Sequence, residues 1–132
     1  KDMCDLLVRS TERTAHCTGM VLTIAISYGG RAEIAEAARQ MAAEVASGEL
    51  SIDQIDEDAI TARLQTNTLP DPDLVIRTSG EQRISNFMLW QLAYAEMIFL
   101  PVLWPDFDAA AFDAAIDEYK RRERRYGAVS PA

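Results

Sequence analysis

The chain has 132 residues, of which 48% are hydrophobic, and a formal net charge of −8. A chain of this size can form one domain that buries roughly two-thirds of its unfolded surface, and its longest apolar stretch, residues 97–104, is far shorter than the roughly 20 residues of a membrane-spanning helix. Spread evenly, the charge would argue against nucleic acid and other anionic ligands, but residues 44–73 carry −7 of it and the rest is nearly balanced.

The first third of the chain predicts a helix followed by a strand. Apolar residues recur at helical spacing over residues 3–18, and Gly19 can end that helix. Three apolar β-branched residues, Val21, Ile24 and Ile26, in the run 21–26 predict a buried strand, which Gly29 and Gly30 end.

The two cysteines, Cys4 and Cys17, follow no metal-ligand spacing. Two thiols without a disulfide framework favour a reducing compartment such as the cytoplasm. We expect both side chains to be buried or half-buried.

The middle of the chain predicts two helices and a second strand. Apolar residues at helical spacing place a helix over residues 31–46. A short acidic helix should follow, with Asp53 or Asp56 as its cap. The apolar triplet 74–76 then predicts a second buried strand.

Three further elements complete the expected order: a helix over residues 85–95, a strand over 97–100 and a helix over 109–125. Strands that alternate with helices predict a parallel α/β sheet. Parallel sheets need both faces covered and their edges protected, and three strands are few for such a sheet. The predicted fold class is therefore α/β, a parallel sheet flanked by helices, in a partial domain from which strands are missing.

The stretch 77–85 directly follows the second predicted strand, and ligands of parallel α/β sheets bind beyond the carboxyl ends of strands. Arg77 and Arg83 supply planar cationic groups, and the glycine-containing turn between them frees backbone N–H groups. Ser85 adds a hydroxyl at a helix start. These are the parts of a phosphate or diphosphate pocket.

Each of these residues also has an ordinary structural role available. Ser85 can be the N-cap of the helix over residues 85–95, and a capping serine still leaves helix N–H groups for an anion. Arg77 and Arg83 can form exposed ion pairs, for example with Glu81, that contribute only about 0–1 kcal/mol. Spacing alone leaves both interpretations open.

Residues 73–96, DLVIRTSGEQRISNFMLWQLAYAE, resemble the signature block of the cis-prenyltransferase family. Residues 28–31, 103–107 and 122–127 resemble other C-terminal blocks of that family, in the same order. Within the family, the resemblance is greatest to the bacterial undecaprenyl diphosphate synthases. It implies that residues 1–132 are the C-terminal part of a single domain and lack its N-terminal strands.

The resemblance also implies roles for individual residues. Arg77, Arg83 and Ser85 match the family's ligands for the diphosphate of isopentenyl diphosphate. Glu96 matches its magnesium-binding acid, and a carboxylate beside a diphosphate suits the hard Mg²⁺ ion. These roles stand beside the structural ones given above.

A second site element is implied at the end of the chain. Arg125 and Gly127 match the C-terminal element that completes the neighbouring subunit's active site in homodimers of the family. The alternative for Arg125 is a basic helix end that interacts favourably with the helix dipole.

The activity implied is the condensation of isopentenyl diphosphate with an allylic diphosphate such as farnesyl diphosphate, with Mg²⁺ as cofactor. The product would be a cis-polyprenyl diphosphate such as undecaprenyl diphosphate, a lipid carrier for bacterial cell-wall sugars. The resemblance further implies a cytoplasmic homodimer that associates with the membrane through its lipid product, and no nucleic acid partner.

Two departures from the family pattern are present. Ser27 stands where the family usually has Asn before the Tyr-Gly-Gly-Arg block. The family's N-terminal Asp-Gly-Asn-Gly-Arg-Trp segment, which carries the catalytic Asp, has no counterpart here. We therefore expect no catalytic residue in this chain, and no transferase activity from the chain alone.

Two other functions remain open from the sequence. The chain could be a non-catalytic partner subunit that leaves ionisation of the allylic diphosphate to another polypeptide. It could also be a generic phosphate-binding α/β module that prefers no particular phosphate. The intact set of Arg77, Arg83, Ser85 and Glu96 argues against the first of these.

Overall fold

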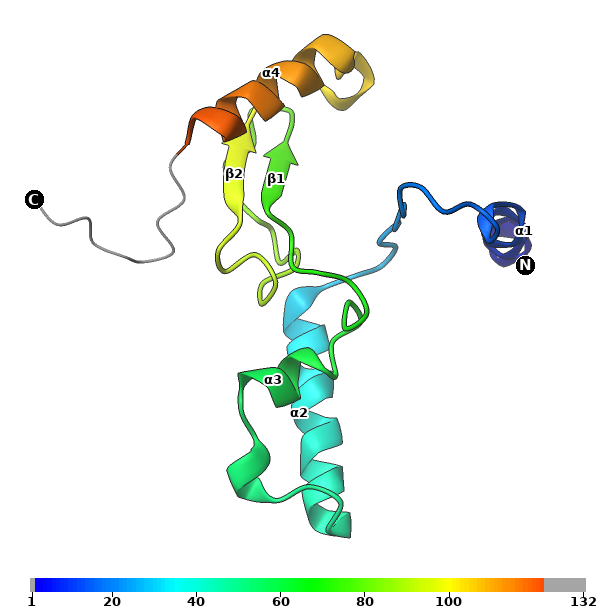
Figure 1. Cartoon of the computed structure of the whole chain (residues 1–132), viewed down its shortest axis with the longest axis vertical. Helices are drawn as coiled ribbons and strands as arrows, with labels where there is room; N and C mark the ends of the chain where they lie inside the picture. Colours follow the sequence, from blue (N-terminus) through cyan, green and yellow to red (C-terminus); the bar gives the residue numbers. More distant parts are fainter. Residues whose placement is uncertain (1, 123–132) are drawn as a thin grey trace, which may run out of the picture.

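The computed structural model describes residues 2–122. In chain order the elements are α1 (Asp2–Thr14), α2 (Gly30–Ser47), the 3₁₀ helix η1 (Ile52–Gln54), α3 (Glu57–Thr61), β1 (Leu74–Arg77), β2 (Glu96–Phe99), the 3₁₀ helix η2 (Trp104–Asp106) and α4 (Ala109–Arg121). Figure 1 shows α4 beside the two strands, α2 beside α3, and α1 standing apart from the other elements. Within the described residues, no helix is both long and apolar enough to cross a membrane.

The strands β1 and β2 form a parallel pair, as predicted. Leu74 lies opposite Glu96 and Arg77 lies opposite Phe99. The backbone N–H of Leu100 donates to the carbonyl oxygen of Arg77 at 2.8 Å, which closes the ladder at its carboxyl end. The predicted fold class, a parallel sheet with flanking helices, is confirmed, with two strands among the described residues.

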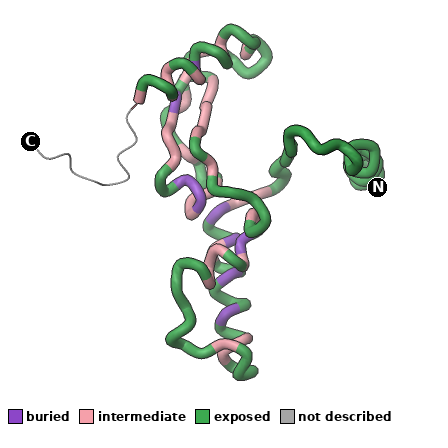
Figure 2. Tube along the Cα trace, viewed as in Figure 1, coloured by how far each residue is buried: buried purple, intermediate pink, exposed green. Residues whose placement is uncertain are grey.

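The buried side chains are few and lie in two places, where α2 packs against α3 and where α4 packs against β2. Ile98 on β2 is the largest fully buried side chain, with 2% of its surface exposed. The other buried apolar residues are Ala37, Met41, Leu64, Leu92 and Ala115. Figure 2 shows that the buried positions gather on α2 and around the strands.

The caps of the helices follow the expected chemistry. Gly48 ends α2 with φ 81°, a left-handed conformation that glycine adopts without a steric penalty. Of the two candidate caps for α3, the structure selects Asp56, whose side chain accepts from the N–H of Ala59 at 2.8 Å. Asp108 caps α4 in the same way through the N–H of Ala111 at 2.9 Å. The predicted helix over 109–125 is confirmed as far as Arg121; Arg122 already has an extended backbone, and residues 123–125 lie outside the described range.

The predicted strand over residues 21–26 is wrong. These residues form no strand, and their side chains are exposed, with 75% of Val21 and 65% of Ile24 accessible. A strand satisfies its backbone groups through a neighbouring strand, and no described segment pairs with this one. The apolar run keeps the composition of a buried strand without forming one.

The predicted helix over residues 85–95 is also wrong, and Ser85 is not a helix cap. This stretch forms consecutive turns, in which Ser85 and Asn86 take positive φ values of 48° and 64°. Asn86 accepts two hydrogen bonds from the start of α2, one from the N–H of Gly30 to its carbonyl oxygen at 2.8 Å and one from the N–H of Arg31 to its side chain at 2.9 Å. These long-range contacts replace the helical hydrogen bonds that the local sequence favours.

The two thiols were expected to be buried or half-buried, and this prediction is wrong. Cys4 and Cys17 are both free and exposed. Both lie in the first 17 residues, where α1 contributes no side chain to the core.

Candidate functional site

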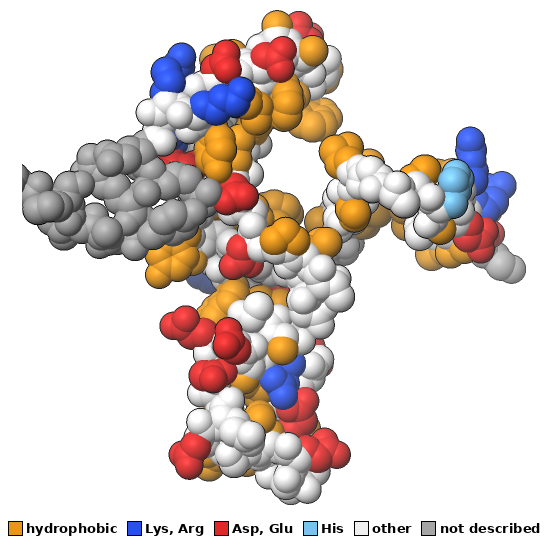
Figure 3. All heavy atoms as spheres, in the orientation of Figure 1, with side chains coloured by type: hydrophobic (Ala, Val, Ile, Leu, Met, Phe, Trp, Pro, Cys, Tyr) orange, Lys and Arg blue, Asp and Glu red, His pale blue; other side chains and the backbone are white. Residues whose placement is uncertain are grey.

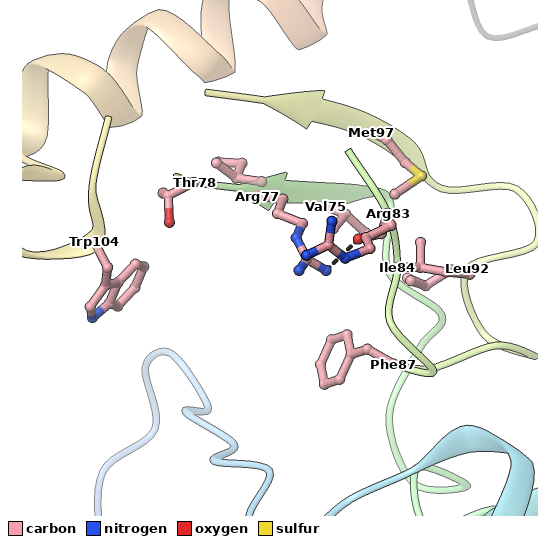
Figure 4. Close-up of a pocket in the computed structure, with 10 residues that line it drawn as sticks. Val75, Arg77, Thr78, Arg83, Ile84, Phe87, Leu92, Met97 and Trp104 are labelled. Carbon is pink, nitrogen blue, oxygen red and sulfur yellow. Dashed lines mark hydrogen bonds between the residues drawn. The ribbon is translucent and has the colours of Figure 1, made fainter. Parts of the chain in front are cut away.

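A pocket of about 230 Å³ opens beside β1 and the turns that follow it. Figure 4 shows ten side chains around it. They are Val75, Ile76, Arg77, Thr78, Arg83, Ile84, Phe87, Leu92, Met97 and Trp104. The structure thus brings together the two arginines that the sequence singled out.

The cationic part of the pocket consists of Arg77 and Arg83. The guanidinium of Arg77 donates a hydrogen bond to the carbonyl oxygen of Arg83, and Figure 4 shows the two side chains close together. Arg83 forms an ion pair with Glu81, and 67% of the Arg83 side chain is exposed. An incoming anion can therefore reach Arg83 from solvent, although Glu81 competes for it.

The turn between Arg77 and Arg83 is fixed by two backbone hydrogen bonds to the segment that follows β2. The N–H of Ser79 donates to the carbonyl oxygen of Val102 at 2.7 Å, and the N–H of Gly80 donates to that of Leu100 at 2.9 Å. Both residues have a φ of 68°. The expectation that this turn frees its N–H groups for an anion is wrong for Ser79 and Gly80, because both are used to fix the turn against the chain that leaves β2.

Apart from the two arginines and Thr78, the side chains that line the pocket are apolar. Figure 4 shows Phe87, Ile84 and Leu92 on one side of the arginines and Trp104 on the other. Trp104 is 71% exposed and stacks on Phe107 with ring centroids 5.8 Å apart. The pocket therefore joins two guanidinium groups to an apolar surface, an arrangement that suits a small ligand with an anionic head and a hydrocarbon tail.

The other two predicted ligands lie elsewhere. Ser85 is exposed and is not among the residues that line the pocket. Glu96 begins β2 and lies opposite Leu74, whereas Arg77 ends β1. Arg77 lies three residues beyond Leu74 on β1, so Glu96 and Arg77 are about 10 Å apart along the strand direction. Within one chain, Glu96 and the arginine pair lie at opposite ends of the strands.

The carboxylate of Glu96 is occupied by a protein cation. Arg122 donates from Nη1 to Oε2 of Glu96 at 2.8 Å and to the carbonyl oxygen of Met97 at 2.9 Å, and from Nη2 to Glu118. The hydrogen bonds to Glu96 and Glu118 raise the pKa of the Arg122 guanidinium.

A ready-made magnesium site is not present among residues 2–122. No group of three or more His, Cys, Asp or Glu side chains is arranged there to hold a metal ion. Mg²⁺ in proteins takes one or two carboxylates together with water and substrate phosphates. At the start of β2 the described carboxylates are Glu96 and Glu118, and the Arg122 guanidinium bonds an oxygen of each. The donor set therefore does not fit a preformed magnesium site.

A buried carboxylate ties the turns beside the pocket to α2. Glu33, with only 4% of its surface exposed, accepts from the hydroxyl of Tyr28 at 2.5 Å, from the N–H of Gln65 at 2.8 Å and from the side chain of Gln91 at 3.1 Å. Burial, followed by the contact with Glu33, raises the pKa of Tyr28 to about 12. Tyr28 also meets Phe87 edge to face, with centroids 5.6 Å apart, so this network supports the apolar side of the pocket.

Sequence reasoning missed the roles of Trp104 and Arg122. Both belong to segments that were singled out by resemblance, residues 103–107 and 122–127, yet neither received a role of its own. Trp104 lies five residues after the end of β2, and its place in the pocket depends on the path of that connecting segment. The two residues that did receive a role there, Arg125 and Gly127, lie outside the described residues.

The comparisons with known proteins agree on one family. The family model described as putative undecaprenyl diphosphate synthase matches residues 1–127. An isoprenyl transferase 2 of Bradyrhizobium diazoefficiens is 50% identical over 128 residues, covering 97% of this chain and 51% of that protein. A farnesyl-diphosphate-specific ditrans,polycis-undecaprenyl-diphosphate synthase of Xanthomonas campestris is 52% identical over 126 residues, covering 96% of this chain and 49% of that protein.

Solved structures show the same likeness. The lavandulyl diphosphate synthase of Lavandula x intermedia, crystallised with dimethylallyl diphosphate, matches with a TM-score of 0.88 and 43% identity over 93% of this chain and 53% of that one. A probable undecaprenyl diphosphate synthase of Campylobacter jejuni matches with a TM-score of 0.78 and 34% identity over 96% of this chain and 57% of that one. The chain spans about half the length of the relatives it matches.

Proposed function

The chain belongs to the family of undecaprenyl diphosphate synthases and related isoprenyl transferases, and on that premise we propose that the whole protein condenses isopentenyl diphosphate with an allylic diphosphate. In this proposal the described chain supplies the isopentenyl diphosphate pocket. Farnesyl diphosphate is the proposed allylic substrate, after the printed specificity of the Xanthomonas relative.

One observation carries the proposal: the pocket joins Arg77 and Arg83 to an apolar wall. Isopentenyl diphosphate has the matching two halves, a diphosphate and a branched five-carbon alkene. Guanidinium groups bind phosphate oxygens through paired, charge-assisted hydrogen bonds. The alkene would then lie against Phe87 and Trp104, which Figure 4 places on either side of the arginines.

The proposed reaction balances with these parts. The allylic diphosphate loses pyrophosphate from its C1, the terminal alkene carbon of isopentenyl diphosphate bonds to that C1, and a proton leaves C2 of the isopentenyl unit. Arg77 and Arg83 would hold the diphosphate that is retained, so that the double bond is oriented for attack. The residues that assist departure of the pyrophosphate are not assigned within residues 2–122.

Magnesium is proposed for the whole protein, because the family's reaction expels pyrophosphate and a divalent cation would offset its charge. Glu96 is its proposed ligand in this chain. Since the described residues do not fit a preformed site, no step is assigned to the metal here.

The product proposed is a cis-polyprenyl diphosphate such as undecaprenyl diphosphate, a carrier used in cell-wall synthesis. We also propose a cytoplasmic homodimer that meets the membrane through its lipid product. In that dimer Arg125 and Gly127 would complete the neighbouring subunit's site.

The test uses this chain alone and a fusion protein in which the N-terminal half of the Xanthomonas relative precedes it. Each is incubated with farnesyl diphosphate, labelled isopentenyl diphosphate and Mg²⁺, and label is counted in extracted polyprenyl lipid. We expect label with the fusion protein and none with the chain alone. Glu96→Gln in the fusion protein should raise the magnesium concentration needed for turnover, because a neutral amide is a poorer ligand for a hard cation.

The remaining functions predict other outcomes. A generic phosphate-binding module would bind phosphate, pyrophosphate and isopentenyl diphosphate alike. A non-catalytic partner subunit would leave the fusion protein inactive until a second, catalytically complete chain is added. Label in lipid made by the chain alone would contradict the assignment of a single diphosphate pocket to it.

A further inference from the structure

Asn86 joins the turns beside the pocket to the start of α2. Gly29 precedes α2 and has no side chain that could cap the helix. Instead, the carbonyl oxygen of Asn86 accepts from the N–H of Gly30 at 2.8 Å, and its Oδ1 accepts from the N–H of Arg31 at 2.9 Å. The first N–H groups of a helix have no partner within it, and an Asn side chain can satisfy one of them. The cap of α2 therefore comes from the pocket side, 55 residues after Arg31.

The two segments approach closely at this point. A Cβ atom on Gly29 would lie 2.8 Å from Nδ2 of Asn86. A Cβ atom on Gly30 would lie 3.0 Å from the backbone nitrogen of Leu89. Both distances are shorter than the roughly 3.5–4.0 Å of an ordinary contact between carbon atoms. The two glycines therefore allow the turns over residues 85–88 to reach the start of α2.

The turns have a backbone conformation that these contacts stabilise. Ser85, Asn86 and Met88 have φ values of 48°, 64° and 45°. Residues with a side chain adopt this left-handed region infrequently, and Asn tolerates it better than most. Phe87 lies between Asn86 and Met88, and its N–H donates to the carbonyl oxygen of Ile84 at 3.0 Å. The direction of the Phe87 side chain is therefore set by the left-handed residues on either side of it.

The ring of Phe87 is held by the same segment. Tyr28, one residue before the glycine pair, meets the Phe87 ring edge to face at a centroid distance of 5.6 Å. Phe87 also lines the pocket and is 42% exposed, so its ring remains accessible to a ligand (Figure 4). Residues 28–31 thus hold Phe87 twice, at its backbone through Asn86 and at its ring through Tyr28.

We infer that Asn86 is a positioning residue: by capping α2 with its side chain, it holds Phe87 where the hydrocarbon part of a ligand bound by Arg77 and Arg83 would lie. This rests on the proposed function, in which that ligand is isopentenyl diphosphate. Asn86 does not itself line the pocket, so its effect passes through Phe87. The turn between the arginines is fixed separately, by its hydrogen bonds to the segment that follows β2. Asn86 should therefore affect binding of the hydrocarbon part and leave binding of the diphosphate unchanged.

The test compares two ligands by titration calorimetry with the fusion protein. One is isopentenyl diphosphate, and the other is inorganic pyrophosphate, which has the anion without the hydrocarbon. The preference of the protein is the ratio of the pyrophosphate dissociation constant to that of isopentenyl diphosphate. Asn86→Ala should lower this preference by about 3- to 10-fold, the equivalent of a lost helix cap, and change pyrophosphate binding by less than about 2-fold.

Three further variants separate the cap from other effects. Asn86→Asp keeps the acceptor and should leave the preference within about 2-fold of the unchanged protein, since its added charge acts on both anions. Asn86→Gly adopts a φ of 64° without a steric penalty, so it removes only the side-chain cap and should lower the preference by about 2- to 5-fold. Asn67→Ala is the matched control, because Asn67 is exposed and its side chain bonds the Ala62 carbonyl oxygen at 2.9 Å, outside the pocket.

A double variant tests whether Asn86 acts through Phe87. Phe87→Ala should lower the preference, and Asn86→Ala/Phe87→Ala should lower it no further, because both changes remove the same contact. Circular dichroism checks that each variant is folded. Asn86 is exposed, so its substitution leaves no cavity.

The inference would be overturned by an unchanged preference in Asn86→Ala and Asn86→Gly, by additive losses in the double variant, or by an equal loss in Asn67→Ala. The unchanged protein separates the inference from the proposed function. If it does not bind isopentenyl diphosphate, both are contradicted. If it binds and prefers isopentenyl diphosphate while the Asn86 variants keep that preference, the inference alone is contradicted.

Discussion

Residues 2–27 and residues 28–122 carry similar apolar composition but are packed very differently. The first region holds α1 and the apolar run 21–26, and its large apolar side chains are exposed. Figure 3 shows apolar side chains on the surface of this segment, and Figure 2 shows the chain exposed throughout it. The second region contains every buried residue of the described chain.

The difference shows which elements a chain can form from local information. The helix α1 forms its backbone hydrogen bonds within its own segment, so it needs no partner segment for them, and it has no buried residue. The run 21–26 needs a neighbouring strand on its edges and cover on its faces, and without them it forms no strand. Composition marks a residue for burial, but burial itself depends on the partner segment.

The largest expected effect comes from comparing one isoleucine in each region. Ile98→Ala should lower the free energy of unfolding of this chain by about 2–5 kcal/mol, because Ile98 is 2% exposed and its loss leaves a cavity. Ile24→Ala should change it by less than about 0.5 kcal/mol, because Ile24 is 65% exposed. Urea unfolding followed by circular dichroism measures both.

The fusion protein sharpens this comparison. If the N-terminal half covers the run 21–26, Ile24→Ala should become destabilising there, while the effect of Ile98→Ala should stay the same. An equal effect of the two substitutions in the chain alone would contradict the division into two regions.

The next effect concerns pH and the hydroxyl of Tyr28, which belongs to the packed region, residues 28–122. Its folded pKa is raised from 10 to about 12, so the folded state keeps a proton that the unfolded state loses. The contribution of the Tyr28 hydroxyl to the free energy of unfolding is fully present below pH 10 and is lost as the pH rises toward 12. The free energy of unfolding should therefore fall by about 1 kcal/mol between pH 9 and pH 11.

Urea unfolding at those two pH values measures this loss, with Tyr28→Phe as the control for the other tyrosines. The unchanged protein should lose more stability than Tyr28→Phe over this range. An identical loss in the two proteins would mean that the hydroxyl is not held by Glu33.

The smallest effect separates two neighbouring carboxylates. Asp56→Ala should lower the free energy of unfolding by about 1 kcal/mol, because it removes the N-cap of α3, whereas Asp53→Ala should have almost no effect. Thermal unfolding of the two variants decides the matter. A larger loss with Asp53→Ala would reverse the assignment of the cap.

Local sequence signals predicted the elements whose ends are set locally. The helices α2 and α4 and the strands β1 and β2 were placed within a few residues, because periodicity, caps and short apolar runs define them. The helix predicted over 85–95 failed because Asn86 is held by Gly30 and Arg31, more than fifty residues away. No local pattern contains that contact.

The site was also predicted only in part, because some of its features follow from local sequence rules and others depend on distant segments. Arg77 and Arg83 were placed together from the rule that ligands bind beyond strand carboxyl ends, and both line the pocket. Glu96 begins the next parallel strand, so the same rule places it at the opposite end of the sheet, although the family resemblance grouped it with the arginines. The contribution of Trp104 depends on where the chain returns after β2, which the sequence does not specify.

The most direct test of the pocket assignment is titration calorimetry of isopentenyl diphosphate with the fusion protein. Arg77→Ala should weaken binding by about 1.5–3 kcal/mol, because it removes a charge-assisted hydrogen-bond donor from the pocket. Arg39→Ala is the matched control, since Arg39 is exposed on α2 and pairs with Glu36. The predicted result is a larger dissociation constant for Arg77→Ala and no change for Arg39→Ala. An unchanged dissociation constant for Arg77→Ala would contradict the assignment of the pocket to isopentenyl diphosphate.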